Sequence, residues 1–217
     1  MGGIYHVISR FVAKEWFIQS AVERRAFLQL LGPALIGSDW TCFCFAVMSS
    51  HIHLGLIAGC ATMASWMRPA HTVFASWMNE RRERIGSVFV KGPNVVELRR
   101  SGAARLISYV HNNPVRARVV SRPGDSDWTS HRAYLGAGPR PAWLDVDAGL
   151  ALAGFASGTE VEAWMGSGEV RRADLDAHRV EPPRRRGRPR RSASSSEPKR
   201  RNPPEQEAGF IRSGGRI

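Results

Sequence analysis

The stretch VMSSHIHLGL, residues 47–56, places two histidines one residue apart in an otherwise apolar run. Alternate residues of a β-strand point to the same face of a sheet, so His51 and His53 should project together while Ile52 faces the other way. Two neutral imidazoles on one face can ligate a divalent metal ion if a third ligand comes from elsewhere in the fold. The pair is also compatible with two hydrogen-bonded histidines at the edge of a core, so the pattern alone leaves both interpretations open.

The segments around this strand predict a mixed α and β domain. Apolar and aromatic runs of strand length cover 4–10, 40–48 and 51–57, and the segment 87–98 is typical of a hairpin around Gly92. Apolar residues recur at helical spacing between the strands, in the ranges 20–37, 63–86 and 102–113. This order of elements predicts an α+β fold with an antiparallel sheet and helices packed on one face or both.

Several residues predict where the helices begin, bend and end. Ser20 is a candidate N-cap, and Pro33 predicts a kink or a stop in the same helix. Pro69 predicts a break in the second helix, and Gly86 is a candidate C-cap for it. The third helix should end near Pro114, since the residue before a proline avoids the helical conformation.

A second group of polar residues lies in YVHNNPVRARVV, residues 109–120. Tyr109 and Asn113 are four residues apart, so they share one face of a helix. Asn113 offers a hard carbonyl oxygen suited to Mg²⁺ or Mn²⁺, and a metal held by His51, His53 and Asn113 could polarise a phosphodiester beside the Tyr109 hydroxyl. The alternative is structural: Tyr109 is a packed aromatic residue, and Asn113 ends a helix before Pro114.

Composition points to a polyanionic partner. The 217 residues carry a formal net charge of +12, and the excess of Lys and Arg lies in 1–136 and 181–217, whereas 137–180 is acidic. Nucleic acid is the simplest partner for such a chain, and an acidic membrane surface is the alternative. We expect no spanning helix, because no run of about 18 apolar residues occurs, and no secretory signal at the N-terminus.

The three cysteines, Cys42, Cys44 and Cys60, follow no familiar disulfide spacing, so we expect reduced thiols. A zinc site combining Cys42 and Cys44 with the two histidines is a further option. It is disfavoured if the strands run on without a turn, because the cysteines then face away from the histidines.

Five segments in order along the chain resemble the HUH single-strand transposases of the tyrosine type, particularly the REP-associated tyrosine transposases. These segments are YHVISR, FAVMSSHIHLGL, HTVFASWMNERRERIGSVF, YVHNNPVRARVV and DWTSHRAYLG, and the resemblance covers roughly residues 3–150. It implies a ferredoxin-like core and a divalent metal held by His51, His53 and Asn113. It also implies that Tyr109 attacks DNA, leaving a 5′-phosphotyrosine and a free 3′-OH. The substrates of the family are single-stranded ends next to small hairpins.

The chain departs from the family pattern at three places. Phe11 stands where a glycine usually follows the arginine of the first strand. Ser49 and Ser50 stand where Pro-Asn usually precedes the first histidine, and Lys91 is the one basic residue where a basic, aromatic run is usual. We expect Lys91, Arg116 and Arg118 to contact DNA. His111 is predicted to be a structural residue or a phosphate contact.

The C-terminal segment 181–217 has few large apolar residues, and we expect it to be disordered. Its Arg186-Gly187-Arg188-Pro189 stretch resembles an AT-hook, which inserts arginine into the narrow minor groove of A·T-rich duplex DNA. The alternative is a basic tail that binds phosphates without preference.

The sequence therefore predicts a catalytic domain over 1–136, an acidic helical extension over 137–180 and a basic tail over 181–217. The predicted function is metal-dependent cleavage and rejoining of single-stranded or hairpin DNA. The alternative is an inactive DNA-binding protein derived from such an enzyme. We expect a monomer or homodimer in the bacterial cytoplasm, associated with the nucleoid and not with a membrane.

Overall fold

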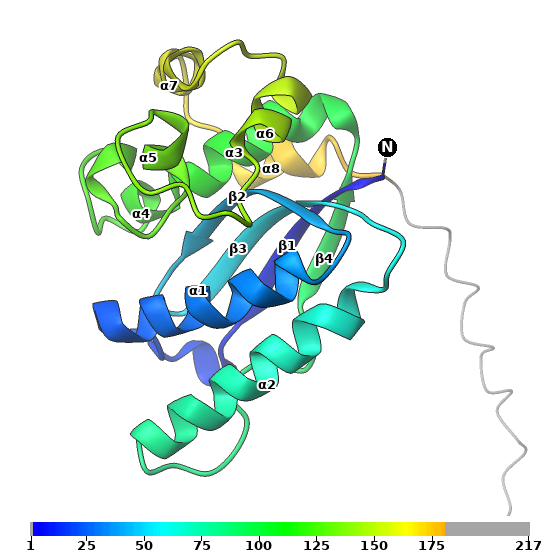
Figure 1. Ribbon diagram of the computed structural model, residues 1–217. Helices are drawn as coiled ribbons and strands as arrows, with labels where there is room; N and C mark the ends of the chain where they lie inside the picture. Colours follow the sequence, from blue (N-terminus) through cyan, green and yellow to red (C-terminus); the bar gives the residue numbers. More distant parts are fainter. Residues whose placement is uncertain (1, 181–217) are drawn as a thin grey trace, which may run out of the picture. The chain divides into compact units, whose positions relative to one another are not determined.

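The computed structural model describes residues 2–180 (Figure 1). Four strands form a single sheet in the order β2-β3-β1-β4, and every neighbouring pair is antiparallel. Their bounds are Ile4–Arg10 for β1, Thr41–Val47 for β2, His51–Ile57 for β3 and Asn94–Leu98 for β4. The predicted α+β fold with a ferredoxin-like antiparallel sheet is confirmed.

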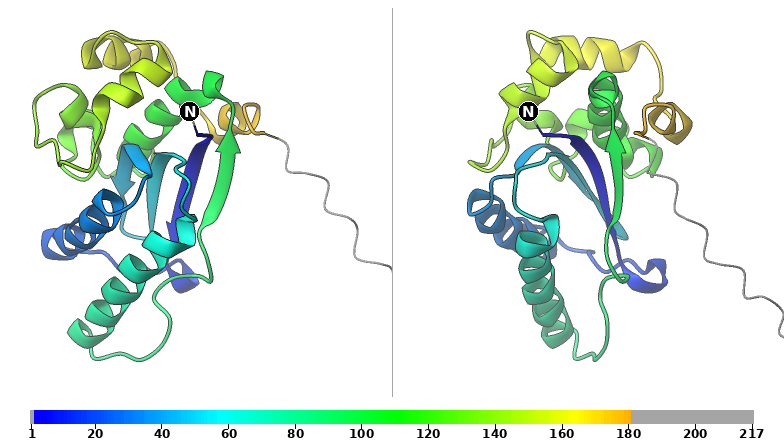
Figure 2. Two further views of the ribbon diagram at one scale, coloured as in Figure 1. Left: turned by 45° about the vertical axis from the view of Figure 1, so that its right-hand side comes forward. Right: turned by 90° about the vertical axis from the view of Figure 1, so that its right-hand side faces the viewer.

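Helices cover both faces of the sheet (Figures 1 and 2). The helices α1 (Ala21–Ile36) and α2 (Met63–Arg81) pack against each other on one face. On the other face, α3 (Ala103–His111) contacts β2 and β3, and α6 (Val146–Ala153) contacts β2. The remaining helical turns are η1 (Val12–Lys14), η2 (Arg100–Gly102), α4 (Asn113–Arg116), η3 (Pro123–Asp125), α5 (His131–Tyr134), α7 (Gly158–Gly166) and α8 (Arg172–Asp176).

The start of α1 follows the sequence prediction. The Ser20 hydroxyl accepts from the Glu23 backbone N–H at 3.2 Å, and the Glu23 carboxylate accepts from the Ser20 N–H at 2.9 Å. Arg82 also donates to Glu23 at 2.9 Å. Burial alone would raise the pKa of Glu23, but these donors outweigh it and lower that pKa to about 2. This cap therefore joins the start of α1 to the end of α2.

The helices do not stop where glycine and proline predicted. The helix α1 continues through Pro33 to Ile36, and α2 runs across Pro69 without the expected break. Both prolines lie on exposed helix faces, where water can satisfy the carbonyl that loses its intrahelical partner. The predicted C-cap at Gly86 is also wrong, because α2 ends at Arg81 and Gly86 lies in the following loop with φ +120°.

The predicted hairpin around Gly92 does not form. Only β4 is a strand there, and it pairs with β1 instead of with the preceding residues. The segment before it makes a single bridge, from Phe89 to Phe11 at the end of β1. The end of β1 thus takes the pairing that a local hairpin would have used.

The acidic segment 137–180 is helical, as predicted, and forms α6, α7 and α8. All three helices pack against α3, the helix that carries Tyr109. This segment therefore supports one of the elements on which the predicted site depends. The basic tail and its Arg186-Gly187-Arg188-Pro189 stretch lie outside the described residues.

Candidate active site between β3 and α3

His51 and His53 project together from β3, as their spacing predicts. Their ring centroids are 4.6 Å apart with the planes at 87°. His53 is 1% exposed, and His51 is partly exposed at the start of the strand. The Ser50 hydroxyl lies 3.0 Å from Nδ1 of His51. Ser50 therefore contacts the ring of the first histidine.

A third histidine, His6 on β1, joins the pair. Its Nε2 is 2.9 Å from Nδ1 of His53, and the two rings are stacked at 5.0 Å between centroids. His6 was not among the site residues predicted from the sequence. The cross-strand partner of His6 is Gly55, two residues beyond His53. The contact between His6 and His53 depends on the register between β1 and β3, and no local sequence pattern specifies this register.

All three imidazoles are held in the neutral form. Burial lowers the pKa of His6 to about 3, and positive charge on Arg172 and Arg179 adds to this effect. Burial and then Arg10 lower the pKa of His51 to about 4. Burial also places the pKa of His53 well below its ordinary value. Near pH 7 each ring therefore keeps an unprotonated nitrogen that can accept a hydrogen bond or bind a metal ion.

Tyr109 and Asn113 lie against this cluster. The Tyr109 ring presents an edge contact to His6 at 5.6 Å and to His53 at 5.7 Å between centroids. The Asn113 amide nitrogen donates to the Tyr109 carbonyl oxygen at 2.8 Å, and the Asn113 side chain is near enough to His51 to raise the pKa of that ring. The structure thus brings together the four residues that the sequence selected from two distant segments.

Arginine side chains surround the cluster. The guanidinium of Arg116 lies over the Tyr109 ring, 4.5 Å from its centroid, and its Nε is 3.6 Å from a Glu169 carboxylate oxygen. Arg10 is the cross-strand partner of His51 and is exposed. Its side chain has no ion pair within residues 2–180. Arg10 was not among the predicted site residues, although it ends the YHVISR segment.

The donor set fits a divalent ion. His53 Nε2 is buried and has no hydrogen-bond partner, which is the state expected of a ligand nitrogen. In the tautomer in which His53 Nδ1–H donates to His6, the lone pair on His53 Nε2 is free. Residues 2–180 contain no group of three His, Cys, Asp or Glu side chains with ligand geometry. A third protein ligand beside the two imidazoles would therefore be the Asn113 amide oxygen.

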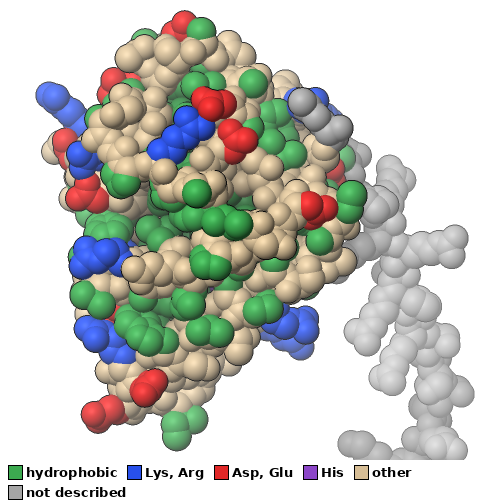
Figure 3. All heavy atoms as spheres, viewed as in Figure 1, with side chains coloured by type: hydrophobic (Ala, Val, Ile, Leu, Met, Phe, Trp, Pro, Cys, Tyr) green, Lys and Arg blue, Asp and Glu red, His purple; other side chains and the backbone are tan. Residues whose placement is uncertain are grey.

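The remaining predicted residues lie elsewhere. Lys91 is exposed in the loop before β4, beside α2 and on the sheet face opposite to the histidines. Arg118 is exposed after α4, with a positive φ of 57°. A DNA contact at either residue stays a prediction. On the face in Figure 3, Lys and Arg side chains are spread among hydrophobic ones and do not form one patch.

His111 is structural, which was one of its two predicted roles. It is fully buried, with Nε2 2.8 Å from the Ser130 hydroxyl and Nδ1 3.2 Å from Nδ1 of His131.

The cysteines are free thiols, with Cys42 and Cys44 buried and Cys60 exposed. Burial raises the pKa of both buried thiols, so they stay protonated near neutral pH.

Comparison with known proteins bears on the fold. A solved structure of a REP-associated tyrosine transposase bound to a REP hairpin matches with a TM-score of 0.53 and 14% sequence identity, covering 67% of this chain and 87% of that one. The chain shares the fold of this transposase. Neither a protein-family model nor a curated protein sequence matches the chain. No helix within residues 2–180 is long and apolar enough to cross a membrane.

Proposed function

We propose that the chain is a metal-dependent transposase or endonuclease that cleaves and rejoins single-stranded DNA through Tyr109. The observation that carries the proposal is the position of the Tyr109 ring against His6 and His53, with Asn113 hydrogen-bonded to the Tyr109 backbone on the side of His51. The similar solved structure, a tyrosine transposase with a bound hairpin, supports DNA as the partner. More specifically, we propose that this reaction serves the transposition of a mobile DNA segment.

In the proposed reaction the Tyr109 oxygen forms a bond to a DNA phosphorus while the bond from phosphorus to the 3′ oxygen breaks. The Tyr109 hydroxyl loses its proton, and the departing 3′ oxygen gains one, so atoms and charge balance. The product is a 5′-phosphotyrosine and a free 3′-OH, and attack by a 3′-OH reverses the step. Covalent catalysis of this kind preserves a phosphodiester-like bond, so rejoining needs no nucleotide cofactor.

The side chains have separate roles in this scheme. His51, His53 and Asn113 would hold Mg²⁺ or Mn²⁺, and the ion would polarise the phosphodiester. His6 is a positioning residue that fixes the tautomer and the orientation of His53. Arg10 and Arg116 place positive charge beside the cluster, where it favours a phosphate group.

Formation of a covalent adduct tests the proposal. The chain has three tyrosines, of which only Tyr109 contacts His6 or His53. Incubation with a labelled hairpin carrying single-stranded ends and Mn²⁺ should give a protein–DNA adduct that resists denaturing electrophoresis. Tyr109→Phe should abolish the adduct, and Tyr5→Phe, which removes a hydroxyl elsewhere, should retain it. Binding without an adduct in the wild type would leave the inactive DNA-binding protein.

The remaining parts of the proposal concern duplex DNA binding, oligomeric state and location in the cell. The Arg186-Gly187-Arg188-Pro189 stretch would add affinity for A·T-rich duplex DNA, and loss of this affinity on deleting 182–217 would support it. The protein would act as a monomer or homodimer in the bacterial cytoplasm, associated with the nucleoid. Sedimentation with and without hairpin DNA distinguishes the two oligomeric states.

A further inference from the structure

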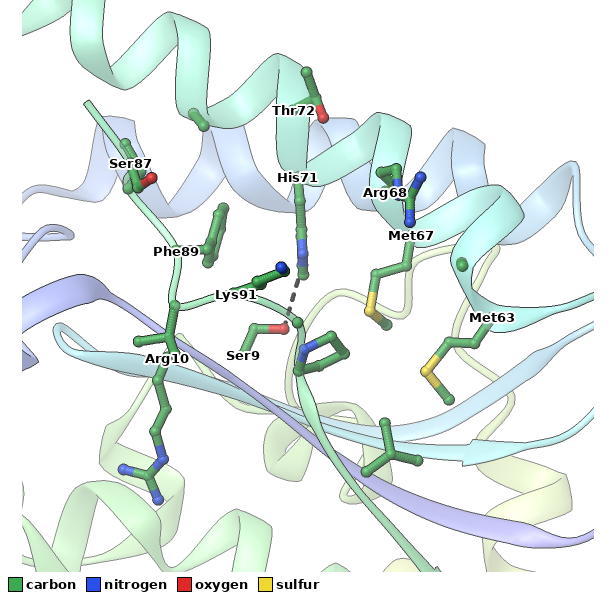
Figure 4. A pocket seen from close by; sticks show the side chains of 17 residues that line it. Ser9, Arg10, Met63, Met67, Arg68, His71, Thr72, Ser87, Phe89 and Lys91 are labelled. Atoms are coloured by element: carbon green, nitrogen blue, oxygen red, sulfur yellow. Dashed lines mark hydrogen bonds between the residues drawn. The ribbon is translucent and has the colours of Figure 1, made fainter. Parts of the chain in front are cut away.

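A cavity of about 670 Å³ lies on the sheet face opposite to the histidines, between α2 and residues 87–95 (Figure 4). This volume is in the range of small-molecule binding sites. None of its 17 lining residues is acidic, and its basic residues are Arg10, Arg68 and Lys91. In Figure 4 the Arg10 side chain points away from the cavity, so Arg68 and Lys91 supply its charge.

The walls suit a flat aromatic group. Met63, Met67 and Phe89 line the cavity together with Pro93. The ring of His71 on α2 stacks on Phe89 with 4.3 Å between centroids and 18° between planes. In Figure 4 the Met67 side chain lies next to the His71 ring, and the Met63 side chain lies farther along α2. Polarizable sulfurs and stacked rings are favourable neighbours for a nucleobase.

The cavity also has a polar floor. The Ser9 hydroxyl lies 3.3 Å from Nε2 of His71 (Figure 4). Burial lowers the pKa of His71 to about 4, so the ring is neutral and can donate or accept near pH 7. Ser9 and His71 can therefore hydrogen-bond to the edge of a base that enters the cavity.

Two free cations stand at the rim. Arg68 on α2 and Lys91 in the following loop are both exposed, and neither has an ion pair in the part of the chain that the structure describes. The cavity thus combines apolar walls and stacked rings with a small polar floor and basic residues at its rim. This combination favours a ligand that has both a planar ring and an anionic group. A nucleotide has this chemistry.

The cavity is connected to the candidate active site through β1. The Val90 N–H donates to the Arg10 carbonyl at 2.9 Å, and the Val12 N–H donates to the Val88 carbonyl at 3.0 Å. Arg10 is in turn the cross-strand partner of His51. One wall of the cavity is therefore fixed to the end of the strand that borders the histidine cluster.

We propose that this cavity binds one unpaired base of a DNA strand that also has a phosphate at Tyr109. Arg68 and Lys91 contact the phosphates that flank this base. The strand passes around the end of β1 near Arg10, from one face of the sheet to the other. The inference rests on the proposed function for its partner, single-stranded DNA, but it does not require that the protein cleaves it.

Photo-crosslinking tests the occupant. The Tyr109→Phe variant is bound to a hairpin oligonucleotide whose single-stranded extension carries 5-iododeoxyuridine at one position at a time. Irradiation should crosslink a single position strongly, and mass spectrometry should locate the link on Phe89, His71 or Met67. Ala64 is exposed at the cavity, so Ala64→Trp should fill the entrance without affecting folding and remove this crosslink. Crosslinks at no position, or crosslinks unchanged by Ala64→Trp, would overturn the proposal.

The rim is tested by the salt dependence of binding. Arg68→Ala and Lys91→Ala should each reduce the slope of log K against log salt by about 0.7, the value for one phosphate contact of a single strand. Arg25→Ala is the matched control, because Arg25 is exposed on α1 and does not line the cavity. Equal slopes for all three variants would contradict the assignment of the rim.

The two proposals fail in different ways. Without a covalent adduct in the wild type, the crosslink in the cavity still reports binding of a base, and the cavity proposal stands alone. With an adduct but no crosslink in the cavity, the proposed function stands and the further inference is wrong.

Discussion

Replacing His6 by alanine tests whether this histidine positions a metal ligand. His6 is 2% exposed, and its Nε2 lies 2.9 Å from Nδ1 of His53. The replacement leaves that nitrogen buried without a partner, which costs about 1–3 kcal/mol of the free energy of unfolding. It also frees the His53 ring to rotate, and loss of such a partner weakens metal affinity by about 10- to 100-fold.

The metal-dependent part is measured by urea unfolding with and without Mn²⁺. At a Mn²⁺ concentration of about 100 times the wild-type Kd, the ion stabilises the wild type by about 2.7 kcal/mol. The same concentration should stabilise His6→Ala by only about 0.4–1.4 kcal/mol, which follows from the weaker affinity. His6→Gln, whose amide oxygen can accept from His53, should recover part of the gain.

A buried histidine outside the cluster supplies the control. His71→Gln removes an imidazole on the opposite face, so Mn²⁺ should stabilise it as much as the wild type. A gain from Mn²⁺ in His6→Ala equal to that of the wild type would refute the positioning role. The absence of any gain in the wild type would refute the metal site itself.

Three further predictions concern charge and packing. Because its pKa is lowered, Glu23 stabilises the fold at pH values above its ordinary pKa of 4.5, and this stability is lost as pH falls toward about 2. The urea midpoint of Glu23→Gln should therefore depend less on pH in this window. The control Glu80→Gln should behave as the wild type. Gly55→Ala would drive its Cβ into Cys44 Sγ, so thermal unfolding should show a loss of about 1–3 kcal/mol, and an unchanged Tm would contradict the packing. Arg10→Ala should slow adduct formation by about 10- to 100-fold, the value of a charge-assisted hydrogen bond to phosphate, and leave Tm unchanged; an equal rate would exclude a phosphate contact there.

The parts of the fold that depend on neighbouring residues could be predicted from the sequence. The cap at Ser20 and the strand 51–57 follow from spacings of two to four residues. The prolines were misleading, because Pro33 and Pro69 lie on exposed helix faces, where water can satisfy the carbonyl that loses its intrahelical partner. The predicted hairpin around Gly92 does not form for a different reason. Residues 4–11 pair with the backbone groups of the 89–98 segment that the hairpin would have used.

In the candidate site, too, the residues that are close in sequence were predicted and those that are distant in sequence were missed. Tyr109 and Asn113 were found because one turn of helix relates them, and His51 and His53 because one strand does. His6 was missed because its contact with His53 spans 47 residues and depends on the register of two strands. Arg10 reaches the cluster through the same register, and Arg172 through the packing of α8 on α3. Contacts of this kind become visible only in three dimensions.

Mapping the site of the covalent link tests the central claim most directly. After reaction with hairpin DNA and Mn²⁺, nuclease trimming and trypsin should leave the peptide 106–116, which contains Tyr109, heavier by a nucleotide attached through its 5′-phosphate. The account predicts this mass shift on Tyr109 and none on Tyr5 or Tyr134. A link to another residue, or cleavage of the DNA with peptide 106–116 unmodified throughout the reaction, would contradict it.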